Sequence, residues 1–340
     1  MVRPYVIRAG TVVTMDDHRR LISDGAVEVT DGVITAVGPA ADLAETDRHV
    51  PDGILLPGLI DAHQHLTGDR LVRSTIPDDI DSQEAIFDWA VPVHEHHSAD
   101  DDELSATLAA VEAACNGITT IVEAGTVAHP ERVAAGLTAV GVRGTVGTWG
   151  WDVDGVPYGG STDEVLDRQK AVLDAFPPGG LVTGWVTLVG HDLMSEELLV
   201  GASDLARERN TNLTFHISPH DRDAPAWIER SGKRPVVRFA ELGVLGRHVL
   251  LGHAVHIDDS ELEAILDTGT AVASCPWAYL RLGQGIPHRH VELLRRGGRL
   301  ALGCDSENAG DQVDVLRAAA LFAGLGKDVR RDVGVGGAHL

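Results

Sequence analysis

From residue 54 onward, short apolar runs alternate with polar loops and with stretches that have the periodicity of amphipathic helices. The runs are residues 54–65, 117–123, 144–151, 181–189, 212–218, 248–256, 270–275 and 299–305. Helices are predicted between them, for example at residues 101–114, 163–175, 196–209, 259–267 and 312–325. Eight strands separated by helices predict an α/β fold, a (β/α)8 TIM-like barrel, with a doubly wound open sheet as the alternative.

The ends of these runs favour the barrel, because almost every run finishes in or near a side chain that can bind a metal or move a proton. These residues are His63, His65, Glu123, His191, His216, His253, His256 and Asp305. In a barrel the C-terminal ends of all strands open on one face. We therefore expect these side chains to gather at that face.

Residues 1–54 have a different pattern, with strands predicted at residues 5–9, 11–15, 26–30 and 33–37 and turns such as Asp31-Gly32 between them. This pattern indicates a small β unit. The barrel is then expected to occupy residues 55–340.

Composition excludes several classes of function. The 340 residues include 51 Asp and Glu against 28 Lys and Arg, a formal net charge of −23, which opposes binding to nucleic acid or to an anionic membrane. The three cysteines are too few and too scattered for a disulfide framework. Since no stretch is typical of a signal peptide or a membrane span, we expect a cytoplasmic protein with a small-molecule substrate.

Two histidines two residues apart on an extended segment project from the same side of a strand, so His63 and His65 can both reach one metal. Residues 50–60 are mostly apolar and predict a buried strand that leads into this pair. With His216 and Asp305 they form the donor set of a catalytic zinc or iron site. Because the first and eighth strands of a closed barrel are neighbours, the His63–His65 pair and Asp305 can lie close to one another.

Asp305 and His253 are the predicted catalytic residues. A carboxylate on the metal can accept a proton from the bound water, which gives a hydroxide nucleophile near neutral pH, and Asp305 is our candidate for this task. His253 is placed to touch the same water or to polarise the substrate. His256 follows at odd spacing, so we expect it to pack behind the site rather than bind the metal.

The sequence resembles the amidohydrolase superfamily, in particular the branch that contains cytosine deaminase, guanine deaminase and the triazine hydrolases. The resemblance rests on four motifs in order, which are LPGLIDAHQH at residues 56–65, TFH at 214–216, LGHAVH at 251–256 and ALGCD at 301–305. It implies His63, His65, His216 and Asp305 as metal ligands, His253 as a partner of the water or substrate, and a small β-sandwich beside the barrel. The fourth run lacks the lysine of binuclear relatives, so one divalent metal is expected, zinc or alternatively iron.

The chain departs from this family pattern at three places. Pro219 stands where deaminases of the branch carry a proton-shuttling glutamate, although His220 lies next to it. Trp277 and Tyr279 stand near the position where relatives place Ser-Asn. The chain also stops after the last predicted barrel helix, so we expect an incomplete β-sandwich, which is compatible with a homo-oligomer in which another subunit completes it.

Four side chains are predicted to bind the substrate, namely Trp277, Tyr279, Glu123 and His220. Together with Trp149, Trp151 and Trp185, the aromatic residues among them are candidates for stacking on a flat ring.

The leading functional hypothesis is a mononuclear metal-dependent amidohydrolase that cleaves a C–N bond of a small, nitrogen-rich heterocycle by deamination or amide hydrolysis. The second is a dehalogenase-like hydrolase that displaces halide from a heteroaromatic ring. The third is a binding or assembly protein that kept the barrel and lost catalysis, and the intact donor set argues against it.

Overall fold

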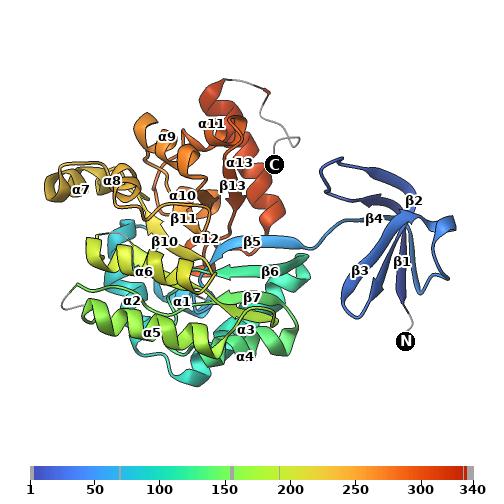
Figure 1. Ribbon diagram of the computed structural model, residues 1–340, viewed down its shortest axis with the longest axis horizontal. Helices are drawn as coiled ribbons and strands as arrows, with labels where there is room; N and C mark the ends of the chain where they lie inside the picture. The colour runs from blue at the N-terminus through green and yellow to red at the C-terminus, as the bar shows by residue number, and fades with distance from the viewer. Residues whose placement is uncertain (1–3, 69, 154–156, 191, 332, 335–340) are drawn as a thin grey trace. The chain divides into compact units, whose positions relative to one another are not determined.

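The computed structural model describes residues 4–68, 70–153, 157–190, 192–331 and 333–334 (Figure 1). The chain divides into two compact units, Met1–Gly58 and Leu59–Leu340. His191, one of the predicted strand-end residues, lies outside the described residues.

The first unit contains one four-stranded sheet in the order β3-β2-β1-β4, in which β1 and β4 are parallel and the other pairs antiparallel. Its elements are β1 (Tyr5–Val13), β2 (Leu21–Thr30), β3 (Val33–Pro39), η1 (Ala40–Asp42) and β4 (Arg48–Leu55). The two strands predicted at residues 5–9 and 11–15 form a single strand instead. Gly10 marks an irregularity in the β1–β4 pairing, where a Cβ would lie 2.1 Å from the Pro51 carbonyl oxygen.

The prediction of one buried strand over residues 50–60 is wrong. β4 ends at Leu55, and the next strand, β5 (Leu59–Gln64), begins after Pro57 and Gly58. Ile54 and Ile60 are 67% and 57% exposed, so these apolar side chains are not in a core. The prediction failed because this apolar segment contains parts of two strands that belong to different sheets, and apolar composition alone does not show burial.

The second unit contains two parallel sheets that join into a barrel. Besides β5, its strands are β6 (Ile118–Glu123), β7 (Arg143–Val146), β8 (Val182–Gly184), β9 (Val186–Gly190), β10 (Leu213–Ile217), β11 (Val249–His253), β12 (Ala271–Ser274) and β13 (Arg299–Leu302). The sheet orders are β5-β6-β7-β8 and β13-β12-β11-β10-β9. All eight predicted runs contain strand residues, with the fourth run divided into β8 and β9.

Two junctions close the ring. Between β8 and β9, the Trp185 amide donates to Val146 of β7 at 3.0 Å and the next amide, of Val186, donates to Asn212 before β10 at 3.0 Å, so this segment bridges both sheets. On the other side, the Asp305 amide donates to the His63 carbonyl at 2.8 Å. The barrel prediction is confirmed, and the open sheet is excluded.

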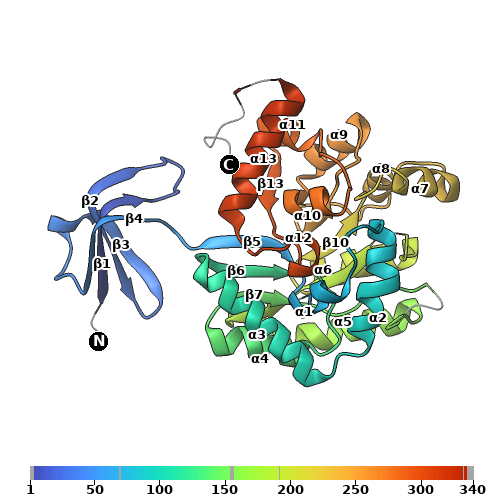
Figure 2. The ribbon, with the colours of Figure 1, turned by 180° about the vertical axis from the view of Figure 1, so that it is seen from behind.

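Helices lie outside the strands in the second unit, as Figure 2 shows from behind. Between β5 and β6 are α1 (Arg70–Thr75), the π-helical turn η2 (Glu84–Ala90), α2 (Val91–Glu95) and α3 (Ala99–Cys115). The others are α4 (Pro130–Val140), α5 (Thr162–Ala175), α6 (Glu196–Glu208), α7 (Asp223–Ser231), α8 (Pro235–Glu241), α9 (Asp259–Thr268), α10 (Pro276–Arg281), α11 (His290–Arg295), α12 (Glu307–Gly310) and α13 (Val315–Arg330). No described helix is both long and apolar enough to cross a membrane.

Local sequence explains where the principal helices begin. Capping boxes formed by Ser98, Ser161 and Asp258 start α3, α5 and α9, each with an acidic residue three positions later. The apolar faces of α6, α8 and α9 pack on β9 to β12, where Leu198, Phe215 and Phe239 are fully buried. Each such side chain stabilises the fold by about 1.5–3 kcal/mol. This packing fixes the strands whose ends carry the predicted site.

Candidate active site

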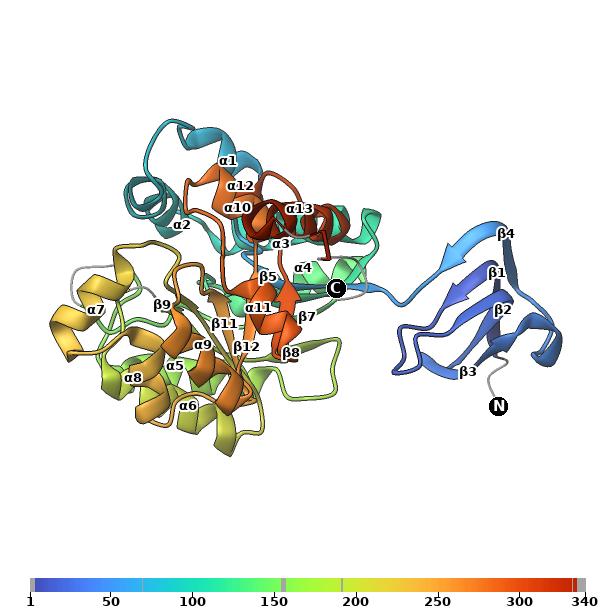
Figure 3. The same ribbon diagram turned by 90° about the horizontal axis from the view of Figure 1, so that it is seen from above.

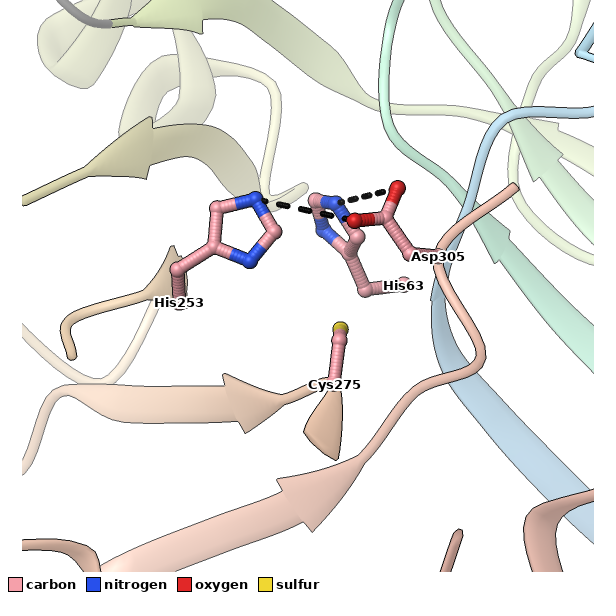
Figure 4. Close-up of side chains that lie close together, drawn as sticks. All are labelled: His63, His253, Cys275 and Asp305. Atoms are coloured by element: carbon pink, nitrogen blue, oxygen red, sulfur yellow. Dashed lines mark ion pairs between the residues drawn. The ribbon is translucent and has the colours of Figure 1, made fainter. Parts of the chain in front are cut away.

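The predicted metal ligands and His253 come together at the C-terminal ends of the barrel strands. His63 lies on β5 and His216 on β10, while His253 is the last residue of β11. His65 directly follows β5, and Asp305 follows β13. Figure 4 shows His63, His253 and Asp305 directed toward one another.

The distances are those of a compact donor cluster. The Nε2 atoms of His65 and His216 lie 3.0 Å apart, and the Asp305 Oδ1 atom lies 3.4 Å from His65 Nε2 and 4.0 Å from His63 Nε2. The Asp305 Oδ2 atom is 4.0 Å from His253 Nε2. The imidazole ring of His63 lies next to those of His65, His216 and His253, with centroid separations of 4.8–5.3 Å.

Burial controls the charge of this cluster. It lowers the pKa of His63 well below its usual value and that of His216 to about 4, so both imidazoles are neutral donors. Burial also raises the pKa of Asp305 to about 7 in the absence of a cation. Neutral imidazoles beside a buried carboxylate form a group that a divalent cation would complement.

The hydrogen bonds around the cluster also fit a metal site. Within the described part of the chain, neither ring nitrogen of His63 has a hydrogen-bond partner although its side chain is 1% exposed, which is costly unless another group binds it. His65 Nδ1 lies 2.7 Å from Thr126 Oγ1, and His216 Nδ1 donates to the Val189 carbonyl. Metal-binding histidines are oriented by such contacts of their second nitrogen.

Cys275, after β12, is a neighbour of this cluster that the sequence did not indicate. Its Sγ atom belongs to a group with His63, His253 and Asp305 whose ligand atoms all lie within 4.8 Å of one another (Figure 4). Burial raises the pKa of this thiol well above its usual value. It is therefore a neutral group beside the candidate ligands.

Asp61 ties the first and last strands together beneath the cluster. Its Oδ1 atom accepts hydrogen bonds from the amides of His63, at 3.2 Å, and Cys304, at 3.1 Å. The backbone also takes left-handed φ angles at Asp305, 63°, and His253, 70°. Such conformations are uncommon outside glycine and occur where a side chain must point in a specific direction.

A pocket opens over this cluster. Its described lining includes His65, His216, His253 and Asp305 together with apolar and aromatic side chains, which are Ile86, Phe87, Ala90, Val91, Trp149, Trp151, Val189, Leu282 and Ala309. The other lining residues are polar, namely His94, Thr126, Gln284 and Ser306. Neither lysine nor arginine occurs in this described lining, so the pocket suits an uncharged or weakly polar molecule with a flat body.

The four residues predicted to bind substrate are not in this lining. Glu123 is fully buried at the end of β6, where its Oε2 atom accepts a hydrogen bond from the Gly125 amide at 2.6 Å.

The other three predicted residues also contact protein groups outside this lining or lie apart from it. The Tyr279 hydroxyl accepts a hydrogen bond from the Cys275 amide at 2.8 Å, and its ring meets that of His253 edge-on. His220 contacts Ser82, with 2.9 Å between Nε2 and Oγ. Trp277 lies on α10, outside the lining as well.

Several pocket residues were missed by sequence reasoning. Thr126 follows β6 closely and could have been found by the same strand-end rule that identified the histidines. Phe87 and His94 lie on η2 and α2, in the long connection between β5 and α3, and no periodicity marks them. Figure 3 shows α1, α10 and α12 grouped on one side of the barrel, an arrangement that only tertiary packing determines.

Comparisons with known proteins agree with this architecture. The model of the "Amidohydrolase family" matches residues 54–334. A 5-methylthioadenosine/S-adenosylhomocysteine deaminase from Syntrophobacter fumaroxidans is 29% identical over 328 residues, which cover 95% of this chain and 74% of that protein.

Two solved structures show the same fold. An adenosine deaminase from Xanthomonas campestris with bound zinc has a TM-score of 0.88 at 24% identity, covering 97% of this chain and 75% of the other. An atrazine chlorohydrolase from Arthrobacter aurescens complexed with zinc has a TM-score of 0.86 at 22% identity, with coverages of 96% and 77%. The resemblance inferred from the four motifs is thus confirmed. The chain belongs to the amidohydrolase family, hydrolases that act on carbon–nitrogen bonds other than peptide bonds.

Proposed function

We propose that this protein is a metal-dependent deaminase that removes an exocyclic amino group from a purine-like, nucleoside-sized substrate and releases ammonia. One observation carries the proposal: His63, His65, His216, His253 and Asp305 converge, and all of them except His63 form the floor of a pocket whose other described lining is mostly aromatic and apolar. The relative from Syntrophobacter fumaroxidans, a deaminase of adenine-containing molecules by its name, supports the substrate class.

In this proposal one divalent cation, zinc or alternatively iron, is held by His63, His65, His216 and Asp305. When bound, it would supply Lewis acidity and lower the pKa of a water molecule toward neutrality. Asp305 accepts a proton from the attacking water and returns it to the departing amine. His253, 4.0 Å from Asp305, polarises the carbon–nitrogen group under attack.

The pocket walls select the substrate. Trp149 stacks on Tyr158 with ring centroids 5.3 Å apart, and together with Trp151 it forms one wall. A flat heterocycle gains stacking energy on such a wall, and the described lining offers no cationic side chain to a phosphate. An uncharged nucleoside therefore fits better than a nucleotide.

A different observation favours a second candidate. Pro219 stands two residues after β10, so no carboxylate at that position can protonate a ring nitrogen during deamination. Displacement of halide from an already electron-poor ring would depend less on such a proton. The second candidate is therefore a hydrolytic dehalogenase.

The experiment combines metal analysis of the purified protein with a screen for released products. Ammonia is measured with 5′-methylthioadenosine, adenosine, guanine, cytosine and an aminotriazine, and chloride with a chlorotriazine. Ammonia from an adenine nucleoside supports the proposal, whereas chloride alone supports the dehalogenase. A protein that retains no metal and releases neither product would contradict both candidates and favour a binding protein.

A further inference from the structure

Gln284 is a buried polar residue of the pocket that the proposed mechanism does not use. It is 4% exposed, and among the residues that the structure describes its side-chain Oε1 atom has no hydrogen-bond partner. It lines the same pocket as His65, His216 and Asp305. A buried carboxamide oxygen without a hydrogen-bond donor destabilises the folded protein. We therefore expect a bound molecule to supply the missing donor.

The backbone on both sides of this side chain is held firmly. The Gln284 amide donates to the Tyr279 carbonyl at 2.8 Å, and the Gln284 carbonyl accepts from His256 Nε2 at 2.6 Å. Gly283 and Gly285 flank it with φ angles of 63° and 97°, which L side chains rarely adopt. The tight Gly-Gln-Gly turn thus holds Gln284 at the pocket, and His256 stabilises this turn.

The chemistry of a carboxamide restricts what it can recognise. It presents an acceptor oxygen beside a donor nitrogen, which is the complement of a ring nitrogen next to an amino group. Glutamine reads adenine in this two-bond manner in other recognition sites. Among the described lining residues Gln284 is the only carboxamide, while the remaining walls are largely apolar.

We infer that Gln284 is a specificity-determining residue that binds the N=C–NH2 edge of an amino-substituted heterocycle. This inference rests on the proposed function, because it names the part of the substrate that the pocket reads. A ring without the amino group leaves the carboxamide partly unpaired and binds more weakly. The pocket therefore distinguishes the aminated substrate from an analogue that has lost the amino group.

The test is calorimetric binding of two probes, adenosine and purine riboside, which lacks the amino group, to the zinc-loaded Asp305→Asn protein. In this parent, Gln284→Met keeps the side-chain length and removes both polar groups, and Gln284→Glu keeps only acceptors. Gln312→Met, outside the pocket, is the control. We expect Gln284→Met to weaken adenosine binding roughly tenfold or more and purine riboside binding much less. Gln284→Glu is expected to weaken adenosine binding as well, because the donor is lost.

Equal losses for the two probes, or no loss in Gln284→Met, would overturn the inference. The proposed function is judged separately, by ammonia release from adenosine with the zinc-loaded wild-type protein. No ammonia together with selective loss of adenosine binding in Gln284→Met would contradict the deaminase and still support Gln284. A parent that binds neither probe overturns the inference on Gln284, whereas the deaminase is still judged by ammonia release from the wild-type protein.

Discussion

The floor and the roof of the pocket are built in different ways. The floor consists of His65, His216, His253 and Asp305, at the ends of strands held by ladder hydrogen bonds. The roof consists of Phe87, His94 and neighbouring residues of η2 and α2, together with Trp149, Trp151 and Gln284 from loops. Short helices and loops depend on side-chain packing for their position. We therefore expect the floor to carry the chemistry and the roof to carry specificity.

The strongest test of this division is Asp305→Asn. We expect it to lower kcat by about 10³-fold or more, because the asparagine cannot accept the proton of the attacking water. Circular dichroism should be unchanged, and an adenine nucleoside should still bind, since the roof is intact. Asp267→Asn, exposed on α9, is the control. Retained turnover in Asp305→Asn would remove this residue from its assigned role.

A second test concerns a pocket-lining side chain that supports the floor. Thr126→Val removes the hydroxyl that lies 2.7 Å from His65 Nδ1, so the imidazole loses its orienting contact. We expect zinc affinity, measured by competition with a chelator, to fall about 10–100-fold. Thr126→Ser, which keeps the hydroxyl, should restore it. If the Thr126→Val and Thr126→Ser proteins bind zinc with equal affinity, the orientation of His65 does not depend on this contact.

The third test probes the roof. Phe87→Leu removes a ring from η2 that lines the pocket, and loss of stacking on a base is expected to raise KM by roughly tenfold. Because the floor is untouched, kcat and zinc content should stay close to those of the wild type. Trp89→Leu on the same turn, 37% exposed and outside the lining, is the matched control. A large fall in kcat for Phe87→Leu with unchanged KM would contradict the division.

The floor could be predicted from sequence because strand ends have a simple rule. Each apolar run determines where a strand ends, and in a barrel all these ends meet, so His63, His216 and Asp305 could be placed together without knowing any contact. The same rule also predicted Glu123 as a pocket residue, but its side chain is buried outside the pocket lining and accepts a hydrogen bond from the Gly125 amide. Sequence indicates which residue stands at a strand end but not whether it faces the pocket.

The roof could not be predicted for a physical reason. His94 and Gln284 reach the pocket only because the connections that carry them fold over it. Hydrophobic periodicity predicts helices and strands but not the course of such connections. The error at residues 50–60 has a related origin. The apolar composition of that segment predicts burial, but Ile54 and Ile60 are exposed on two different strands.

The smallest expected effect is on stability and concerns Glu123 beneath the floor. Burial raises the pKa of Glu123 from its ordinary value of 4.5 to about 8. Between these values the unfolded chain loses the proton that the folded chain keeps, so the free energy of unfolding falls as pH rises. Asp61, whose pKa burial raises to about 7, contributes in the same direction.

Glu123→Gln removes the Glu123 part of this dependence, so the decline in stability from about pH 5 to about pH 8 should be shallower than in the wild type. Denaturant unfolding at several pH values measures it, with Glu131→Gln, exposed on α4, as the control. Parallel declines in wild type and Glu123→Gln would show that Glu123 is ionised in the folded protein. A carboxylate charged at that depth would need a cation close by, so this outcome would extend the charged region of the floor down to β6.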